Sequence, residues 1–243
     1  NDPEMTVVVQ HAPAVSVALG EEFGMKQGTD VVGVMHTAFR RLGFDNVFST
    51  SFTADLTIME EATELVQRVT GGGALPMFTS CSPGWVKFVE QYHPDFLKNI
   101  STCKSPQQMM GAVIKTYFAE KNKIDPAKIF SVSVMPCTAK KFEITRPGMG
   151  RDGVRDVDAV LTTRELAKMI RAAGLDLSKL EPTPADTPFG NRSTAGKLFG
   201  ASGGVMEAAL RTGYFLITGN ELEDLKFEAV RGLDGIKEAK IPI

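Results

Sequence analysis

Short runs of apolar, β-branched residues alternate along this chain with longer segments whose apolar residues recur at helical spacing. The clearest run, 129–135 (IFSVSVM), predicts a strand that is buried on both faces. The clearest helical segment, 55–69, has acidic residues early and three glycines just after its end, as helices often do. Strand, loop and helix in repeated order predict an α/β fold with a mainly parallel sheet and helices on its faces.

The same reasoning divides the whole chain into elements. We expect strands at 6–10, 46–50, 75–79, 129–135, 157–161 and 226–231. We expect helices at 31–42, 55–69, 83–91, 107–121, 163–173 and 203–218. The segment 181–199 is rich in proline, threonine, glycine and aspartate, which predicts a long surface loop. Ligands of such folds bind beyond the carboxyl ends of strands, so the loops after residues 10, 79 and 135 are the expected site.

Length and charge narrow the class of protein. The 243 residues allow a sizeable core, in one large domain or two lobes. A formal net charge of −2 gives no electrostatic footprint for nucleic acid or for an anionic membrane, so we expect neither as a partner. No apolar run reaches the roughly 20 residues of a spanning helix, and the first residues lack the features of a secretory signal. The expected location is cytoplasmic.

The sequence has three cysteines, Cys81, Cys103 and Cys137. This count is low and odd, which argues against a disulfide framework. The sequence contains no C-x-x-C pair, so it does not encode a self-contained zinc or ferredoxin-type site. A metal centre would need ligands that the fold brings together. Cys103 is interpreted most simply as a small buried apolar residue.

Cys81 and Cys137 each follow a predicted strand, which suggests that they share one site. Pro83 can begin a helix just after Cys81, and the positive end of a helix lowers the pKa of a thiol. Lys140 and Lys141 follow Cys137 and would favour its thiolate or hold an anion. The alternative is that the two lysines form only a solvated pair at a helix start.

Glu61 and Glu64 are three residues apart and share one helix face. Two partly buried carboxylates can relay protons, although such pairs more often form a solvated face. Ser105, followed by Pro106, predicts a helix cap that explains the segment around it without any further role. The three histidines are scattered and form no pair at metal-binding spacing.

Five segments together closely resemble the catalytic domain of iron-only ([FeFe]) hydrogenases. They occur in the order of that family, and the resemblance covers essentially the whole chain. They are FTSCSPGW at 78–85, STCKSPQQMMG at 101–111, VMPCTAKKFE at 134–143, RDVDAVLTTREL at 155–166 and GASGGVMEAALR at 200–211.

The resemblance implies reversible H2 oxidation and proton reduction, with electrons exchanged with a ferredoxin-like domain or subunit. It implies two lobes, approximately 1–125 and 126–243 and interleaved, each with a small, mostly parallel sheet. The H-cluster would lie between them: a 4Fe-4S cubane joined through a cysteine sulfur to a di-iron unit that carries CO, cyanide and a bridging dithiolate amine.

The family's cofactor-binding residues carry over by position. Cys137 matches a cubane ligand, and Lys140 matches the lysine that holds a cyanide of the di-iron unit. Glu143 matches a glutamate that pairs within the same motif. Four further positions match residues that line the di-iron unit or pack by its bridge: Ala12, Pro13, Met135 and Pro136.

The family's proton route also has its counterparts here. Cys81 matches the cysteine that exchanges protons with the bridge amine. The route then runs through the positions of Glu61, Ser101 and Glu64. The resemblance therefore favours a relay over a solvated face for the two glutamates.

Two departures from the family pattern bear on function. Ser82 stands where the family has a second cubane cysteine, and serine oxygen is a harder ligand that must be deprotonated to bind iron. Either Ser82 or Cys81 could contact the cluster. A third motif, C-x-x-x-C, with two more cubane ligands, is not in this sequence, so we expect a C-terminally incomplete domain.

Three functional hypotheses follow. The first is a hydrogenase catalytic domain or a fragment of one. The second, favoured by Ser82, is a non-catalytic homologue that acts as a redox or H2 sensor or as an iron–sulfur scaffold. The third is a generic α/β enzyme that binds phosphate at the glycine-rich loop 200–204, and it would need none of the cysteine motifs.

Overall fold

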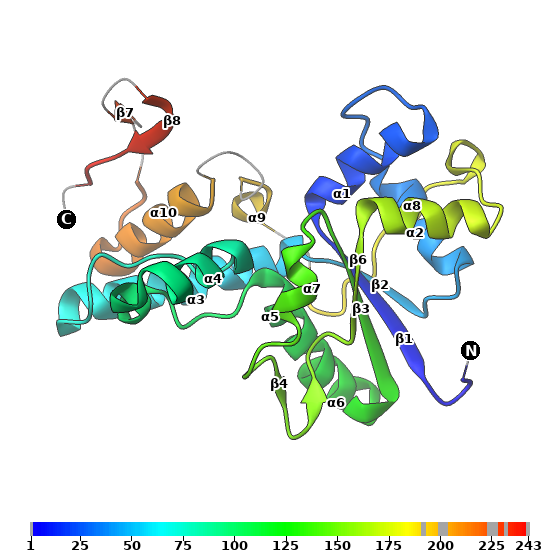
Figure 1. The fold of residues 1–243 in the computed structure, drawn as a ribbon, viewed down its shortest axis with the longest axis horizontal. Coiled ribbons are helices and arrows are strands. Elements are labelled where there is room, and N and C mark those ends of the chain that lie inside the picture. Colours follow the sequence, from blue (N-terminus) through cyan, green and yellow to red (C-terminus); the bar gives the residue numbers. More distant parts are fainter. Residues whose placement is uncertain (1, 191–192, 199–203, 223–227, 231–232, 242–243) are drawn as a thin grey trace.

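A four-stranded parallel sheet lies at the centre of the computed structural model (Figure 1). The model describes residues 2–190, 193–198, 204–222, 228–230 and 233–241. The strand order is β2-β1-β3-β6, and all three pairings are parallel. The strands are β1 (Thr6–His11), β2 (Asn46–Ser49), β3 (Ile129–Met135) and β6 (Ala159–Thr162).

Helices connect the strands and extend the fold. The longer ones are α1 (Pro13–Ala18), α2 (Val32–Arg41), α3 (Ser51–Gly71), α4 (Pro83–Tyr92), α5 (Pro106–Val113), α8 (Thr163–Ala172) and α10 (Gly204–Thr218). The shorter ones are α6 (Ala119–Asn122), α7 (Ala139–Glu143) and α9 (Thr194–Leu198), and a π-helical turn, Ile114–Phe118, joins α5 to α6. Two antiparallel pairs complete the described part: β4 (Gly150–Arg151) with β5 (Val154–Arg155), and β7 (Glu228–Val230) with β8 (Leu233–Glu238).

Apolar side chains from both faces of the sheet build two cores. On one face, Val9 and Val132 pack with residues of α1, α2 and α8, among them Phe39. On the other face, Val8 packs with residues of α5, the π-helical turn and α6, among them Ile114. Burial on both faces explains why the central strands are rich in apolar, β-branched residues.

Helix α3, which carries Glu61 and Glu64, extends away from the sheet in Figure 1. Helices α10, α5 and α9 all pack against α3. The long helix ends at Gly72, whose φ of 77° is the left-handed conformation that glycine adopts without strain. Helix α5 begins at Ser105, whose side chain accepts a hydrogen bond from the N–H of Gln108, as the sequence predicts for a cap.

Most predicted elements are present, with ends shifted by a few residues. Strand 129–135 matches its prediction, and the strand expected at 157–161 lies at Ala159–Thr162. The loop expected at 181–199 contains the short helix α9 near its end. Its earlier part runs beside the free edge of β2, where Asp186 N–H donates to the carbonyl of Val47 at 2.8 Å. This contact protects an exposed strand edge.

Two predictions about the sheets are wrong. Residues 75–79 form no regular strand, because only Phe78 bridges to Ile100 and Pro76 has no N–H to donate to a ladder. Consequently the described residues contain one parallel sheet and not two. Two strands of that sheet precede residue 125 in the sequence and two follow it. The boundary between lobes at this residue stays a prediction. No helix within the described ranges is both long and apolar enough to cross a bilayer.

Candidate functional site

The loops after β1 and β3 meet at the carboxyl edge of the sheet. Ala12, the residue before α1, donates its N–H to the carbonyl of Val134 at 3.0 Å and packs against the cluster that contains Met135. Met135 is buried, whereas Pro13 and Pro136 are exposed. The structure therefore brings together the two segments that the resemblance assigned to one side of the cofactor.

Lys140 joins this edge to the Cys81 loop. Its ammonium group donates to the carbonyl of Cys81 at 2.9 Å and to both oxygens of Glu143, at 3.0 and 3.1 Å. Only 12% of the Lys140 side chain is exposed, so its charge lies in the protein and not in bulk water. The helices that follow the two cysteines, α4 and α7, pack against each other. The fold thus places both cysteine loops around one lysine.

A buried polar network holds Glu143, the partner of Lys140. The Oε2 atom of Glu143 accepts hydrogen bonds from Ser105 Oγ at 2.8 Å and from Gln107 Nε2 at 2.9 Å. Ser133 Oγ donates to Oε1 of Gln107 at 2.6 Å, which fixes which end of that amide faces Glu143. Ser105 was assigned only a capping role in the sequence, and Gln107 and Ser133 were missed. The one sequence feature that could have indicated Gln107 and Ser133 is that each is a polar residue in a mainly apolar segment.

The predicted relay glutamates occupy different environments on α3. Glu64 accepts from Ser101 Oγ at 2.7 Å and forms an ion pair with Arg68 at 2.6 Å. The backbone N–H of Thr102 donates to both of its oxygens. Burial tends to raise the pKa of Glu64, but the hydrogen bonds from Ser101, Arg68 and Thr102 outweigh it and lower the pKa. Glu64 is therefore held as a carboxylate.

Glu61, one helical turn earlier, is only 2% exposed. Burial raises its pKa, and the negative charge of Glu64 raises it further, although the N–H of Ser80 and the hydroxyl of Ser101 partly offset both effects. Neither carboxylate oxygen makes a well-formed hydrogen bond within the described part of the chain. A carboxyl group in this position favours its neutral, proton-carrying form.

Cys81 is partly buried at the inner end of the same series. Burial raises the pKa of its thiol and the charge of Glu61 adds to this effect, while Lys140 lowers the pKa. The helix-end argument from the sequence predicted a lowered pKa and is wrong in sign, because desolvation of the sulfur dominates. A protonated thiol beside Glu61 can donate a proton as well as accept one.

The two positions predicted to ligate iron differ from this buried series. Cys137 is exposed, and so is Ser82, which precedes α4 without capping it through its side chain. No group of three histidine, cysteine or acidic side chains in the described residues could hold a metal ion. One thiol and one hydroxyl do not make a four-ligand cubane site, so these residues fit one side of an H-cluster and not the whole of it.

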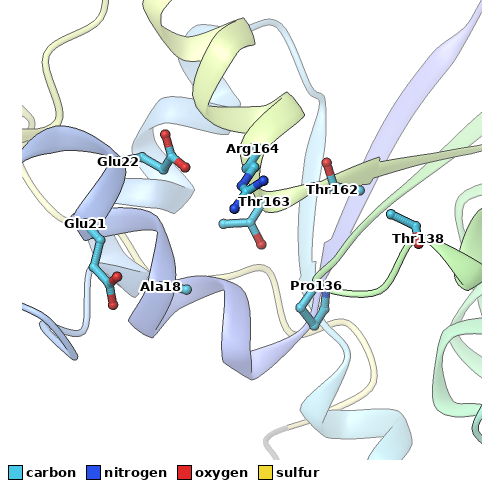
Figure 2. Close-up of a pocket in the computed structure, with 8 residues that line it drawn as sticks. All are labelled: Ala18, Glu21, Glu22, Pro136, Thr138, Thr162, Thr163 and Arg164. Atoms are coloured by element: carbon cyan, nitrogen blue, oxygen red, sulfur yellow. The ribbon is translucent and has the colours of Figure 1, made fainter.

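A cavity of about 660 Å³ lies beside Cys137, at the carboxyl ends of β3 and β6. Figure 2 shows Pro136 and Thr138 on one side of it, Glu21 and Glu22 on the other, and the start of α8 between them. Its lining residues are Ala18, Glu21, Glu22, Pro136, Thr138, Thr162, Thr163 and Arg164. The exposed cysteine loop therefore borders open space.

Two histidines that the sequence gave no special role form a buried pair. The Nε2 atoms of His11 and His36 are 2.8 Å apart, and His36 Nδ1 lies 3.0 Å from the carbonyl oxygen of Thr183. Burial lowers the pKa of His36. The contact ties the end of β1 to the segment that covers β2. The glycine-rich loop 200–204, a candidate anion site, lies largely outside the described residues.

The fold and the site define an α/β protein in which loops at the strand ends surround a buried lysine–glutamate pair, with two glutamates on α3 whose pKa values are shifted in opposite directions. Residues 5–243 match the family model described as the iron only hydrogenase large subunit, C-terminal domain. The chain belongs to this family.

Individual relatives agree with that assignment. The chain is 55% identical to iron hydrogenase 1 of Clostridium pasteurianum over all of its residues and 42% of the relative. It is 35% identical to cytosolic iron-sulfur assembly component 3 of Rattus norvegicus, covering 94% of this chain and 50% of that protein. A variant of the apo [FeFe]-hydrogenase HydA1 from Chlamydomonas reinhardtii superposes with a TM-score of 0.86 at 47% identity, over 98% of this chain and 60% of that one. The chain thus spans about half the length of these curated relatives.

Proposed function

We propose that this chain forms the proton-handling side of an iron-only hydrogenase catalytic site, in which H2 is oxidised and protons are reduced reversibly. The observation that carries the proposal is the series Cys81, Glu61, Ser101 and Glu64. It leads from the Cys81 loop, to which Lys140 donates, to the two glutamates of α3, and the directions of the pKa shifts are those that a relay needs. Identity to the hydrogenase relative is 55%, against 35% to the assembly component, which supports the enzyme over the scaffold.

The relay works through exchange of hydrogens at Ser101. A neutral Glu61 passes its proton to the Ser101 oxygen while the hydroxyl hydrogen of Ser101 moves to Oε2 of Glu64, which already accepts it at 2.7 Å. Cys81, at the inner end of the series, then gives a proton to Glu61 and restores its neutral form. The reverse sequence delivers protons inward. Arg68 fixes Glu64 and also donates to the carbonyls of residues 74 and 98–100, so it holds the outer end of the relay in place.

In the proposed holoenzyme the H-cluster supplies the iron chemistry that splits H2 and the cubane that exchanges electrons. Lys140 would donate to an anionic group of the di-iron unit, because its buried ammonium faces the Cys81 loop. Ala12, Pro13, Met135 and Pro136 would line that unit and limit the access of water. Cys137 would ligate the cubane, and Ser82 is a weaker candidate for a second corner.

The finer organisation is part of the same proposal. The H-cluster would lie between the sheet lobe and a second lobe that includes α3 and α4. Electrons would pass to a ferredoxin-like domain or subunit, and H2 and protons would be the small reactants. The cytoplasmic location stays a prediction.

The direct test uses the full-length protein that carries this chain, matured with its H-cluster. H2 evolution from a reduced dye supports the proposal. A protein with a spectroscopically confirmed H-cluster and no H2 evolution or H2 oxidation contradicts it.

Ser82 supports a second candidate, a non-catalytic sensor or scaffold. Changing Ser82→Cys offers the cubane a thiolate in place of a hydroxyl. If the hydrogenase proposal is correct, Ser82→Cys sharpens the cubane signal in electron paramagnetic resonance and maintains or raises H2 evolution. If Ser82→Cys strengthens the cubane signal while the variant and the unsubstituted protein both lack hydrogenase activity, the non-catalytic sensor or scaffold is favoured.

A further inference from the structure

A second cavity, of about 300 Å³, lies beside the relay and between α4, α7 and the 97–105 segment. Its wall contains hydroxyls, a thiol and charged groups, contributed by Ser80, Ser101, Cys103, Ser105, Glu143 and Arg146. A single buried water needs only about 10–15 Å³ and two to four polar partners. This space is therefore large and polar enough to hold several waters.

The cavity touches both halves of the site. Ser101 belongs to the relay, and Glu143 is the partner of Lys140. Cys103 lies between them: its thiol is 3.6 Å from Oε2 of Glu64, and its N–H donates to Ser101 Oγ at 3.1 Å. Ser80 Oγ donates to the carbonyl of Cys103 at 2.6 Å and fixes the segment from the other side.

The hydrogen bonds of Ser101 decide where its proton goes. A hydroxyl has one hydrogen and two lone pairs. The hydrogen points to Glu64 and the N–H of Cys103 occupies one lone pair. The second lone pair can accept a proton, which in the proposed relay comes from Glu61. When Glu64 cannot accept, because it is already protonated or has been replaced, a water held in the adjoining cavity would offer Ser101 another acceptor.

We propose that this cavity is a second, water-filled exit for protons, which branches from the relay at Ser101 and bypasses Glu64. The inference rests on the proposed function and extends it. In the exit step Glu61 gives a proton to the Ser101 oxygen, and Ser101 releases its own hydrogen to a cavity water. One O–H bond breaks and one forms on Ser101, Glu61 becomes a carboxylate, and the hydronium passes its proton to bulk solvent. Cys103 is a positioning residue that controls how much cavity water lies next to Ser101.

The first test asks whether water reaches the branch point and does not depend on catalysis. Burial raises the pKa of the Cys103 thiol to about 11. A small alkylating agent should therefore label Cys103 in the folded full-length protein at a rate that rises about tenfold per pH unit across the alkaline range below that pKa. Peptide mass spectrometry separates Cys103 from Cys81 and Cys137. No labelling of Cys103 in native protein, with normal labelling after unfolding, overturns the hydrated cavity.

The second test measures the branch in the full-length, matured enzyme with its main exit blocked. In a Glu64→Gln background, Cys103→Ser adds a hydroxyl that binds water next to Ser101, whereas Cys103→Val presents an apolar side chain that excludes water. Both substitutions change the side-chain volume little. The expected result is residual H2 evolution about threefold higher for the serine variant and about threefold lower for the valine variant. These changes are smaller than the roughly 10²–10⁴-fold contributed by a proton-transfer group, because Cys103 only positions the water. The solvent isotope effect should also differ between them.

Residual rates that are equal for the three proteins, or that change in the same direction for serine and valine, overturn the branch. Circular dichroism and the cluster spectrum confirm that each variant is folded and loaded. If the unsubstituted enzyme itself is inactive while Cys103 labels as expected, the proposed function fails and the hydrated cavity stands. The two failures are thus distinguishable.

Discussion

The relay and the ligand positions of this site are built in opposite ways. Glu61 and Ser101 are at most 6% exposed, and Glu64 accepts hydrogen bonds from four different residues. Cys137 and Ser82 are exposed at the ends of loops. The proposed relay is thus enclosed by the packing of this chain, whereas the proposed metal ligands are not. If the proposal is correct, proton handling and cofactor binding are separable properties, which substitutions can test one at a time.

The largest effect is expected at the inner end of the relay. Glu61→Gln keeps the shape of the side chain but cannot exchange a proton, so H2 evolution by the matured full-length enzyme should fall by about 10²–10⁴-fold. Glu60→Gln is the matched control, because Glu60 is exposed on the same helix. An equal loss of activity in both variants, or no loss in either, would contradict the claim that Glu61 transfers protons and the exposed Glu60 does not.

The second effect concerns the lysine between the two cysteine loops. Lys140→Met leaves the buried carboxylate of Glu143 without its cation, which should cost about 3–5 kcal/mol in the free energy of unfolding. Lys141→Met is the control, because its pair with Glu165 is exposed and contributes at most about 1 kcal/mol. Urea unfolding of the two variants measures the difference. Equal losses of stability would mean that Lys140 is solvated.

A smaller effect is expected in strand β3, where two buried serines can be compared. Ser133→Ala leaves the Oε1 atom of Gln107 without its donor and should cost about 1–3 kcal/mol. Ser131→Ala should be nearly neutral, because the Ser131 hydroxyl has no hydrogen-bond partner in the described structure. Thermal unfolding of both variants checks this. A larger loss for Ser131→Ala would show that the network does not hold Glu143.

The smallest effect is a difference in pH dependence between neighbouring glutamates. The pKa of Glu61 is raised above 4.5, so the folded state binds its proton more tightly and wild-type stability falls as pH rises from 4.5 through the folded pKa. Glu61→Gln should remove that fall. The pKa of Glu64 is lowered, so its stabilisation exists above 4.5 and disappears as pH falls through the folded pKa.

Glu64→Gln should therefore be less stable than wild type at neutral pH and equal to it in acid. Denaturant midpoints of the two variants and the wild type, measured across pH, should show trends of opposite sign. Trends of the same sign would mean that the two carboxyls share one environment.

The sequence predicted the parts of this molecule that depend on local pattern. Strand 129–135 is mainly apolar and β-branched, and the helix after Ser105 has its cap and its proline, so both were located correctly. The run at 75–79 is also mainly apolar, but it contains Pro76 and has only Ile100 beside it, and pairing depends on neighbours that periodicity does not reveal.

Long-range polar contacts were the hardest part of the site to predict. Ser133 and Gln107 are 26 residues apart, and the cause of the raised pKa of Cys81 lies in desolvation and in Glu61, which is on another helix. Spacing gave the correct helix face for Glu61 and Glu64 but not their opposite pKa shifts. Burial raises the pKa of Glu61, whereas hydrogen bonds from Ser101 and Thr102, supplied by a distant loop, help to lower the pKa of Glu64.

The most direct measurement follows the proton on Glu61 by infrared difference spectroscopy of the matured full-length enzyme as it is cycled between H2 and an inert gas. The account predicts a carboxylic acid C=O band that responds to the gas, shifts in D2O, disappears in Glu61→Gln and persists in Glu60→Gln. A gas-dependent band that survives in Glu61→Gln would assign the moving proton to another group and contradict the relay.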